Sequence, residues 1–412
     1  MRLTTVNAAA TVNKMTYKEV LCDANSLYRG YKASLTSAND WKENAQRYML
    51  NWLSHLFELQ DSLASLTYKN SEVDEFELHE RGRIRPITSL AIPDRIVRHV
   101  LCDDILMPEI RKKIIYDNSA SITGRGEHFA HKRLEVHLHR YYKQHGNKGW
   151  ILIGDFSKFY DNIVHSTAME QLLDLVHHDE YIAWLLDEIF AGFRQDVSYM
   201  TNEEYCRVMN GMFNKLEYRQ IPETARNKGE KFLEKSVSIG DQLSQIIGIY
   251  YPNKIDQYVK TVRGQKYYGR YQDDWRIISD SKEELEDILS NIIRIAGELG
   301  IFVNMKKTKI HRLDKRFVYL QRRYWLRGDG KIVRQINPKR VTAMRRKLKK
   351  LSAKVLAGEI PYKNAESTFK GWMGAYYKIL SHDQRNGLIS LYESLFNKKI
   401  TINHGKMIML EH

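Results

Sequence analysis

Apolar side chains recur at intervals of three to four residues along the first part of the chain. From residue 17 to residue 67 this spacing predicts mostly helix, as at Trp52 and Leu56. The pattern then changes to alternation. Residues 74 to 90 carry apolar and polar side chains in turn on both sides of Arg81-Gly82-Arg83, which predicts two strands joined by a turn. The chain is therefore expected to begin with helices and to continue with a β-hairpin.

Short apolar strands and amphipathic helices follow one another through the middle of the chain. Pro93 stands where a helix can start, and residues 196–235 are polar, charged and contain glycine, so an insertion with weak structure is expected there. Helices are expected at 94–107, 126–145, 166–177, 179–193, after Gly240 and at 282–299, with strands at 150–155, 301–311 and 315–326 and a hairpin at 266–280. This mixture predicts an α+β fold.

Charge separates the C-terminal part of the chain from the rest. Residues 331–354 contain ten Lys or Arg and no Asp or Glu, and we expect a boundary just before them, at Gly328-Asp-Gly330. The whole chain has 65 Lys and Arg against 50 Asp and Glu, a net charge of +15 over 412 residues. Such an excess favours a polyanionic partner, and nucleic acid is favoured over a membrane surface.

The remaining composition excludes several classes of protein. Apolar residues make up 43% of the chain, which is enough for a sizeable core, so disorder is not expected. No apolar run is long enough to cross a membrane, and the first twenty residues lack the apolar centre of a secretion signal. The three cysteines, Cys22, Cys102 and Cys206, are far apart and form no metal-binding or disulfide pattern. We therefore expect a cytoplasmic protein that does not bind membranes.

Three acidic residues are candidates for metal chemistry. Asp155 ends a strongly apolar strand, and Asp273 and Asp274 stand together at the tip of the expected hairpin. Paired carboxylates supply the oxygen ligands that Mg²⁺ prefers, and substrate phosphates complete its coordination. A solvated turn would be the better explanation of Asp273 and Asp274 if they stood alone. Their order after ILIGDFSKFYDNI and SIGDQLSQIIGIYY argues against that simpler interpretation.

Together these segments resemble the palm domain of reverse transcriptases, in particular prokaryotic ones. The matching palm motifs are Asp155-Phe-Ser-Lys-Phe-Tyr160, Ser238-Ile-Gly-Asp-Gln-Leu-Ser-Gln245 and Tyr271-Gln-Asp-Asp274. The fingers motif of the family is matched by Arg83-Ile-Arg-Pro-Ile87 with Ile92-Pro-Asp-Arg-Ile-Val97, and its primer grip more weakly by Phe317-Val-Tyr-Leu-Gln321. The resemblance implies a right-hand polymerase. Its parts would be an N-terminal helical extension (1–73), fingers (74–150), a palm with an antiparallel sheet (151–328) and a basic helical thumb with a tail (329–412).

The resemblance also implies roles for residues around the three acids. Asp155, Asp273 and Asp274, with the backbone carbonyl of Phe156, would hold two Mg²⁺ ions, or Mn²⁺ in their place. The nucleotide would be bound by Arg85, Arg83, Arg95, Tyr160, Gly240, Gln242 and either Lys306 or Lys307. Tyr160 would crowd the ribose 2′-hydroxyl and so favour deoxynucleotides; a core tyrosine is the alternative. For Arg83 and Arg95 the alternative is a solvated basic hairpin.

Contacts to nucleic acid are expected in the C-terminal part. Tyr319, Leu320 and Gln321 would grip the primer. The basic run and one aromatic residue would bind the template–primer duplex through Lys339, Arg340, Arg345, Arg346, Lys349, Lys350 and Trp372. Helix core is the alternative for Trp372, Tyr376 and Tyr377, which have helical spacing.

The glycine-led motif departs from the common family pattern at two places. Ile239 stands where glutamine is usual and Gln245 where proline is usual, and this form resembles defence-associated enzymes and those of diversity-generating retroelements. The resemblance implies DNA synthesis from dNTPs on an RNA template, in an antiphage defence system with a partner non-coding RNA or protein, such as a second reverse transcriptase. Three alternatives stay open: a mutagenic retroelement enzyme, a non-catalytic RNA-binding scaffold, and an RNA-dependent RNA polymerase. Homo-oligomers are also left open.

Overall fold

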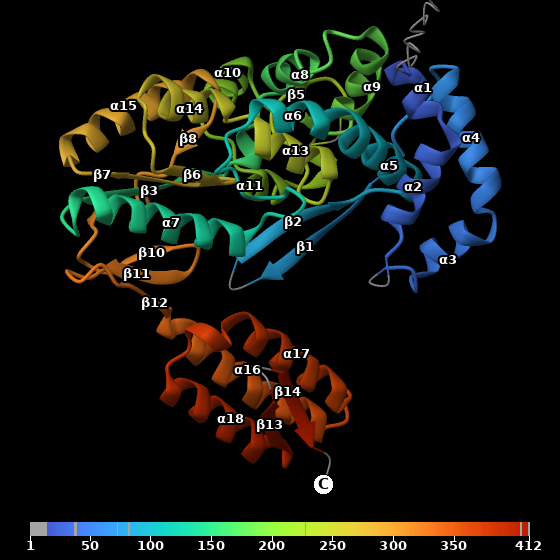
Figure 1. Ribbon diagram of the computed structural model, residues 1–412. Coiled ribbons are helices and arrows are strands. Elements are labelled where there is room, and N and C mark those ends of the chain that lie inside the picture. Colours follow the sequence, from blue (N-terminus) through green and yellow to red (C-terminus); the bar gives the residue numbers. More distant parts are fainter. Residues whose placement is uncertain are drawn as a thin grey trace, which may run out of the picture. The chain divides into compact units, whose positions relative to one another are not determined.

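The computed structural model describes residues 15–36, 39–71, 73–80, 83–226, 228–403 and 406–410. Helices and strands are mixed throughout, which confirms the predicted α+β class (Figure 1). The chain divides into two compact units, one made of residues up to 126, 154–275 and 286–308, and the other of residues 127–153, 276–285 and 309 onward. Within the described ranges, no helix combines the length and the apolar character that crossing a membrane requires.

The first unit begins with the expected helices. These are α1 (Tyr17–Cys22), α2 (Ala24–Ser34), α3 (Glu43–Leu50) and α4 (Trp52–Ala64). Helix α1 starts where Thr16 and Glu19 form a capping box, which satisfies backbone N–H groups that have no partner within the helix. Gly30 lets α2 approach α5 closely, because a Cβ atom there would lie 2.9 Å from the carbonyl oxygen of Ile96.

The expected hairpin follows as β1 (Asp74–Glu80) and β2 (Arg83–Ser89), which pair antiparallel. The turn residues Arg81 and Gly82 lie outside the described residues. The helix expected at 94–107 is instead three consecutive segments, α5 (Ile92–His99), the π-helical η1 (Val100–Leu106) and α6 (Met107–Lys113). Pro108 has no N–H to donate, which favours a break in the regular α-helical pattern just before it.

The main sheet has the strand order β6-β7-β3-β8, and β9 also pairs with β3. Its strands are β3 (Trp150–Ser157), β6 (Tyr268–Tyr271), β7 (Asp274–Ser279), β8 (Phe302–Val303) and β9 (Lys309–Arg312). The pairings of β3 with β8 and β9 are antiparallel. The single strand expected at 301–311 is wrong, because a turn at Asn304–Thr308 separates β8 from β9.

Helices connect the strands of this sheet. They are η2 (Tyr160–Asn162), α8 (His165–Leu173), α9 (Glu180–Ala191), α13 (Gln242–Tyr250), α14 (Asn253–Gln257), the π-helical η3 (Tyr258–Val262) and α15 (Lys282–Glu298). The apolar residues of α13 that predicted a helix after Gly240 are buried, including Leu243, Ile246 and Ile249. The helices predicted at 166–177, 179–193 and 282–299 are confirmed within a few residues.

The segment 196–235 has more structure than its polar sequence predicts. It contains β4 (Gln195–Asp196), α10 (Asn202–Asn210), α11 (Lys215–Arg219), α12 (Glu223–Arg226) and β5 (Phe232–Leu233). Val197, Phe213, Tyr218 and Leu233 form a small core of their own. The expectation of weak structure is therefore wrong, because apolar residues spread through the polar sequence pack together into this core.

A buried histidine beside this insertion makes stability depend on pH. His165 is 3% exposed, and its Nε2–H donates to the carbonyl of Ser236 at 2.6 Å. Burial lowers the pKa of His165 from 6.5 to about 4. Below pH 6.5 the His165 imidazole therefore binds a proton in the unfolded chain but stays neutral in the folded chain. The free energy of unfolding falls as the pH drops from 6.5 toward 4.

At pH 5 this difference costs about 2 kcal/mol. We expect the free energy of unfolding of His165→Asn, measured by urea denaturation, to lose this part of the decline between pH 7 and pH 5. Wild type and variant declining in parallel would show that His165 is not the cause.

The second unit contains α7 (Glu127–His145) and an antiparallel sheet of β10 (Phe317–Tyr319), β11 (Arg322–Leu326) and β12 (Ile332–Ile336). The strand expected at 315–326 is therefore a hairpin, which turns at Leu320 and Gln321 with φ values of 41° and 69°. The boundary expected near residue 328 falls on the turn between β11 and β12, inside one compact unit.

The chain ends with three helices and a hairpin. They are α16 (Pro338–Leu356), α17 (Tyr362–Tyr376), α18 (His382–Phe396), β13 (Lys399–Asn403) and β14 (Lys406–Leu410), with the 3₁₀ turn η4 (Tyr377–Ile379) after α17. Leu348, Phe369, Met373 and Tyr392 are central to the core of these helices.

Candidate active site

Two strands hold the acidic residues of the site. Asp155 lies in β3 and is 8% exposed, and the backbone N–H of Phe156 donates to the carbonyl of Asp273 at 3.3 Å. Gly154 allows this close packing, because a Cβ atom at that position would clash with the indole ring of Trp275. The local fold thus brings Asp155 and Asp273 together, although 118 positions separate them in the sequence (273 − 155).

The turn between β6 and β7 carries Gln272 and Asp273, and Asp274 is the first residue of β7. Gln272 adopts the left-handed backbone conformation with φ of 54°, and its Nε2 donates to the hydroxyl of Ser121 at 3.1 Å. This bond fixes the turn to the segment that follows α6. The sequence did not single out Ser121 for this role.

Asp155 has hydrogen-bond donors on both of its carboxylate oxygens. Lys307 Nζ lies 2.5 Å from Oδ2, and Asn304 Nδ2 lies 3.3 Å from Oδ1. The backbone N–H of Asn304 also donates to the carbonyl of Asp155 at 2.7 Å. Of the two lysines that the sequence left open, Lys307 is the one that contacts Asp155, and both lysines are exposed.

Electrostatics couples the two acids. Burial and the negative charge of Asp155 together raise the pKa of Asp273 to about 6, and the positive charges of Lys307 and Arg85 oppose this rise. Arg85 lies in β2, where it pairs with Leu78. The negative charge of the site therefore lies on Asp155 and Asp273, and the positive charges of Lys307 and Arg85 partly balance it.

The two carboxylates fit divalent cations. The carboxylates of Asp155 and Asp273 carry the hard oxygens that divalent cations prefer, and a cation between them would relieve their mutual repulsion. In the part of the chain that the structure describes, no three His, Cys, Asp or Glu side chains gather as a metal cluster. Asp274 is half-buried at the start of β7.

Tyr160 lies near Asp273. A Cβ atom on Gly248 would come within 2.8 Å of the Tyr160 hydroxyl and would also meet the amide oxygen of Gln272, so the glycine makes room for both side chains. Burial and then the charge of Asp273 raise the pKa of the Tyr160 hydroxyl. The ring is half-buried, which agrees with a wall of the site and also with the core alternative.

Other expected nucleotide-binding residues contact protein groups. Gly240 has φ of 117°, and a Cβ atom there would lie 2.6 Å from the carbonyl oxygen of Thr88, so this glycine serves the close approach of β2. Gln242 donates to Asp103 Oδ1 at 2.8 Å. Arg95 donates to the carbonyl of Leu90 at 2.8 Å. The side chain of Arg83 lies outside the described residues.

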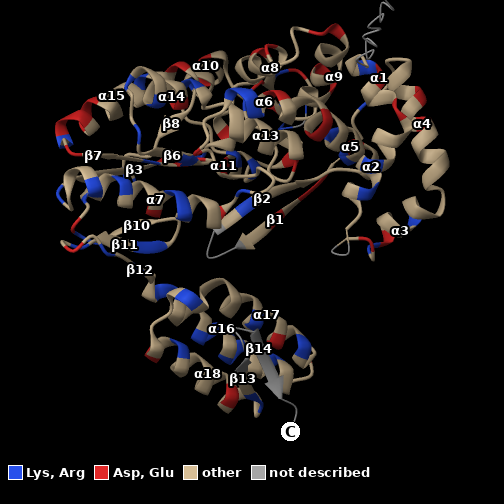
Figure 2. Cartoon of the chain, in the orientation of Figure 1, with Lys and Arg blue, Asp and Glu red and all other residues tan. Residues whose placement is uncertain are grey.

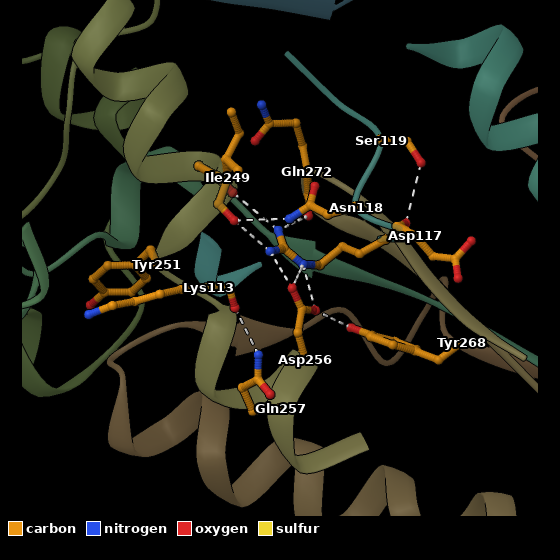
Figure 3. Close-up of polar contacts among 12 residues, drawn as sticks. Lys113, Asp117, Asn118, Ser119, Ile249, Tyr251, Asp256, Gln257, Tyr268 and Gln272 are labelled. Atoms are coloured by element: carbon orange, nitrogen blue, oxygen red, sulfur yellow. Dashed lines mark hydrogen bonds and ion pairs between the residues drawn. The ribbon is translucent and has the colours of Figure 1, made fainter. Parts of the chain in front are cut away.

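A buried ion pair is hydrogen-bonded to the turn between β6 and β7. Arg270 and Asp256 are both fully buried, with Arg270 Nη2 2.7 Å from Asp256 Oδ2. Arg270 also donates to the carbonyls of Ile249 at 2.6 Å and Gln272 at 3.1 Å. The hydroxyl of Tyr268 donates to Asp256 (Figure 3). In the sequence, Arg270 and Asp256 resemble ordinary surface charges, so this support was not predicted.

The expected primer-grip residues differ in exposure. Tyr319 is 2% exposed; its ring meets His131 edge-on, and the Arg276 guanidinium lies over it at 5.3 Å. The Tyr319 side chain therefore belongs to the core of the second unit. Gln321, at the turn, is exposed.

The basic run of the sequence lies mainly on α16 (Figure 2). Its exposed candidates are Lys339, Arg345, Arg346, Lys349 and Lys350. Arg340 is half-buried, with its guanidinium 5.2 Å from the centre of the Tyr376 ring. Trp372, Tyr376 and Tyr377 pack against the helical core, which favours the core interpretation for these three aromatic residues.

Buried Asp155 and half-buried Asp273 lie close together at the turn between β6 and β7, and the positive charges of Lys307 and Arg85 act on Asp273. The model of one family, reverse transcriptase (RNA-dependent DNA polymerase), matches residues 69–323. The chain belongs to this family, and its right-hand polymerase fold follows from that membership.

Two similar proteins illustrate how far the likeness extends. Protein YkfC of Escherichia coli (strain K12) is 23% identical over 252 residues, which cover 59% of this chain and 63% of YkfC. Telomerase from Candida albicans, solved in complex with a TWJ fragment of telomeric RNA, matches with a TM-score of 0.41 and 13% identity. That match covers 84% of this chain and 63% of the telomerase chain. The chain thus spans less than two thirds of either relative.

Proposed function

We propose that the chain synthesises DNA from deoxynucleoside triphosphates on an RNA template. The observation that carries the proposal is the coupled pair of Asp155 and Asp273, found inside a match to the reverse transcriptase family. In this reaction the primer hydroxyl attacks the α-phosphate of the nucleotide, and pyrophosphate leaves.

The residues of the site have separate tasks in this reaction. Asp155, Asp273 and the Phe156 carbonyl would hold two Mg²⁺ ions, with Asp274 in support, and Mn²⁺ would fit the same oxygens. When bound, such ions lower the pKa of the primer hydroxyl and neutralise charge on the phosphoryl group. Arg85 binds the triphosphate, because its planar guanidinium donates two parallel hydrogen bonds to phosphate oxygens.

Primer extension tests the proposal. Purified protein is given an RNA template, a DNA primer, dNTPs and Mg²⁺, and parallel reactions contain a DNA template or NTPs. We expect extension on RNA with dNTPs, abolished by EDTA. An enzyme that extends only with NTPs would be an RNA polymerase. A protein that binds RNA but incorporates neither nucleotide, also with its co-purified RNA, would be a scaffold.

Tyr160 provides a prediction about sugar selectivity. In Tyr160→Ala the space beside Gly248 and Asp273 opens, so a ribose 2′-hydroxyl no longer meets a ring. We expect the preference for dNTPs over NTPs, measured as a ratio of kcat/KM values, to fall roughly 10- to 100-fold. Tyr160→Phe keeps the ring and should keep the preference. Equal ratios in all three proteins would assign Tyr160 to the core instead.

Two further proposals concern partners. The exposed cations of α16 would bind the phosphates of the template–primer duplex, so affinity should fall steeply with salt. The glycine-led motif Ser238–Gln245 resembles that of defence-associated enzymes, and we propose a role in antiphage defence with a partner RNA or protein. Phage plaque counts on bacteria that express the chain with its neighbouring genes test this role, and a nearby template/variable repeat pair would favour diversification.

A further inference from the structure

We propose that Lys307 competes with a divalent cation for one carboxylate oxygen of Asp155, and so sets how tightly the protein binds metal before a nucleotide arrives. This inference rests on the proposed function, because it takes Asp155 as a metal ligand. Lys307 would be a positioning residue, because its contact with Asp155 lowers the affinity of the site for a divalent cation.

The contact is direct and specific to one atom. Lys307 Nζ lies 2.5 Å from Oδ2 of Asp155, while Oδ1 accepts from Asn304 Nδ2 at 3.3 Å. The carboxylate therefore has little freedom to rotate and offer a different oxygen. A cation that binds Oδ2 must take the place of the ammonium group or approach it against the repulsion of like charges.

The two partners differ in how easily they can move. The side chain of Asp155 is 12% exposed and that of Lys307 is 48% exposed. Because about half of the Lys307 side chain is already exposed, its ammonium group can leave the carboxylate and regain hydration. A lysine is also held at a carboxylate by a compact charge, without the two-pronged geometry that fixes an arginine.

The backbone beneath Lys307 holds the lysine in reach. The N–H groups of Lys307 and Thr308 donate to the carbonyl of Asn304 at 3.0 and 2.8 Å, which closes a tight turn. Asn304 is itself bonded to Asp155. Movement of Lys307 is therefore confined to its side chain, and its neighbour Lys306 is exposed on the same turn and serves as a matched control.

Mn²⁺ binding measures this competition without any catalysis. The full-length protein is titrated with Mn²⁺ in the absence of nucleotide, and free Mn²⁺ is followed by electron paramagnetic resonance. We expect Lys307→Met to bind Mn²⁺ roughly tenfold more tightly than wild type. Lys306→Met should match wild type, and Asp155→Asn should lose the site. A thermal melt provides a second measurement, in which added Mn²⁺ should raise the Tm of Lys307→Met more than that of wild type.

Each other outcome decides against the inference. Unchanged or weaker Mn²⁺ affinity in a folded Lys307→Met protein would overturn it and leave the proposed function intact, provided that Asp155→Asn still loses the ion. An equal gain in Mn²⁺ affinity in Lys306→Met would show that the effect comes from removing any nearby positive charge, not from the contact of Lys307 with Asp155. If wild type and Asp155→Asn bind Mn²⁺ alike, the metal centre itself is wrong and the proposed function fails with it.

Discussion

Asp273→Asn should reduce DNA synthesis by roughly a thousandfold or more while the protein stays folded. The amide removes a negative charge from the pair that the structure couples, and a neutral oxygen is a poor ligand for a divalent cation. The same change relieves repulsion between the buried carboxylate of Asp155 and the half-buried side chain at position 273. We therefore expect the thermal stability of the variant, measured without metal, to equal or exceed that of wild type.

Primer extension under single-turnover conditions measures the loss. Asp383→Asn is the matched control, because the Asp383 side chain is fully exposed in α18 and the substitution is chemically identical. Its rate should equal that of wild type. Comparable rates in Asp273→Asn and wild type would remove Asp273 from the chemistry, and a lowered Tm in Asp273→Asn would show that folding, not catalysis, was impaired.

Arg270→Met should destabilise the fold by about 3–5 kcal/mol. The substitution leaves Asp256 buried without its charged partner. The carbonyls of Ile249 and Gln272 each lose the hydrogen bond from Arg270, although Asn118 still donates to Ile249. Because Gln272 lies in the turn that carries Asp273, activity should fall even in the fraction that remains folded. Urea denaturation measures the free energy of unfolding, and primer extension is assayed well below the transition.

The double variant Arg270→Met/Asp256→Leu separates two explanations. If the unpaired charge is the main cost, the double variant should be more stable than Arg270→Met alone. The exposed pair of Arg47 and Glu43 supplies the control, since Arg47→Met should leave stability within experimental error. A small effect of Arg270→Met would mean that water or a neighbouring group replaces the arginine.

Local pattern was sufficient to predict much of the fold and the acidic residues. Asp155 follows a run of apolar residues, and that run is buried because β3 lies inside a sheet. The α15 helix and the β1–β2 hairpin were predicted for the same reason, since one face of each repeats with the period of its element. These features depend on neighbours in sequence.

Features that depend on distant residues were not predicted. The turn at Asn304 decides which lysine contacts Asp155. The need for glycine at position 240 comes from the close approach of Thr88, more than 150 residues earlier in the chain. The Leu320–Gln321 turn uses positive φ values without a glycine, so composition does not mark it. The buried pair of Arg270 and Asp256 is invisible in sequence, because a charged residue reveals its burial only through its partner.

The insertion at 196–235 has a consequence for how this chain diversifies. Its two ends are joined by the pairing of β4 with β5, Gln195 opposite Leu233, and its core is its own. A segment whose ends already meet can lengthen or shorten at little cost in chain entropy. A change in the length of this segment should therefore cost less stability than a change in the strands that carry Asp155 and Asp273.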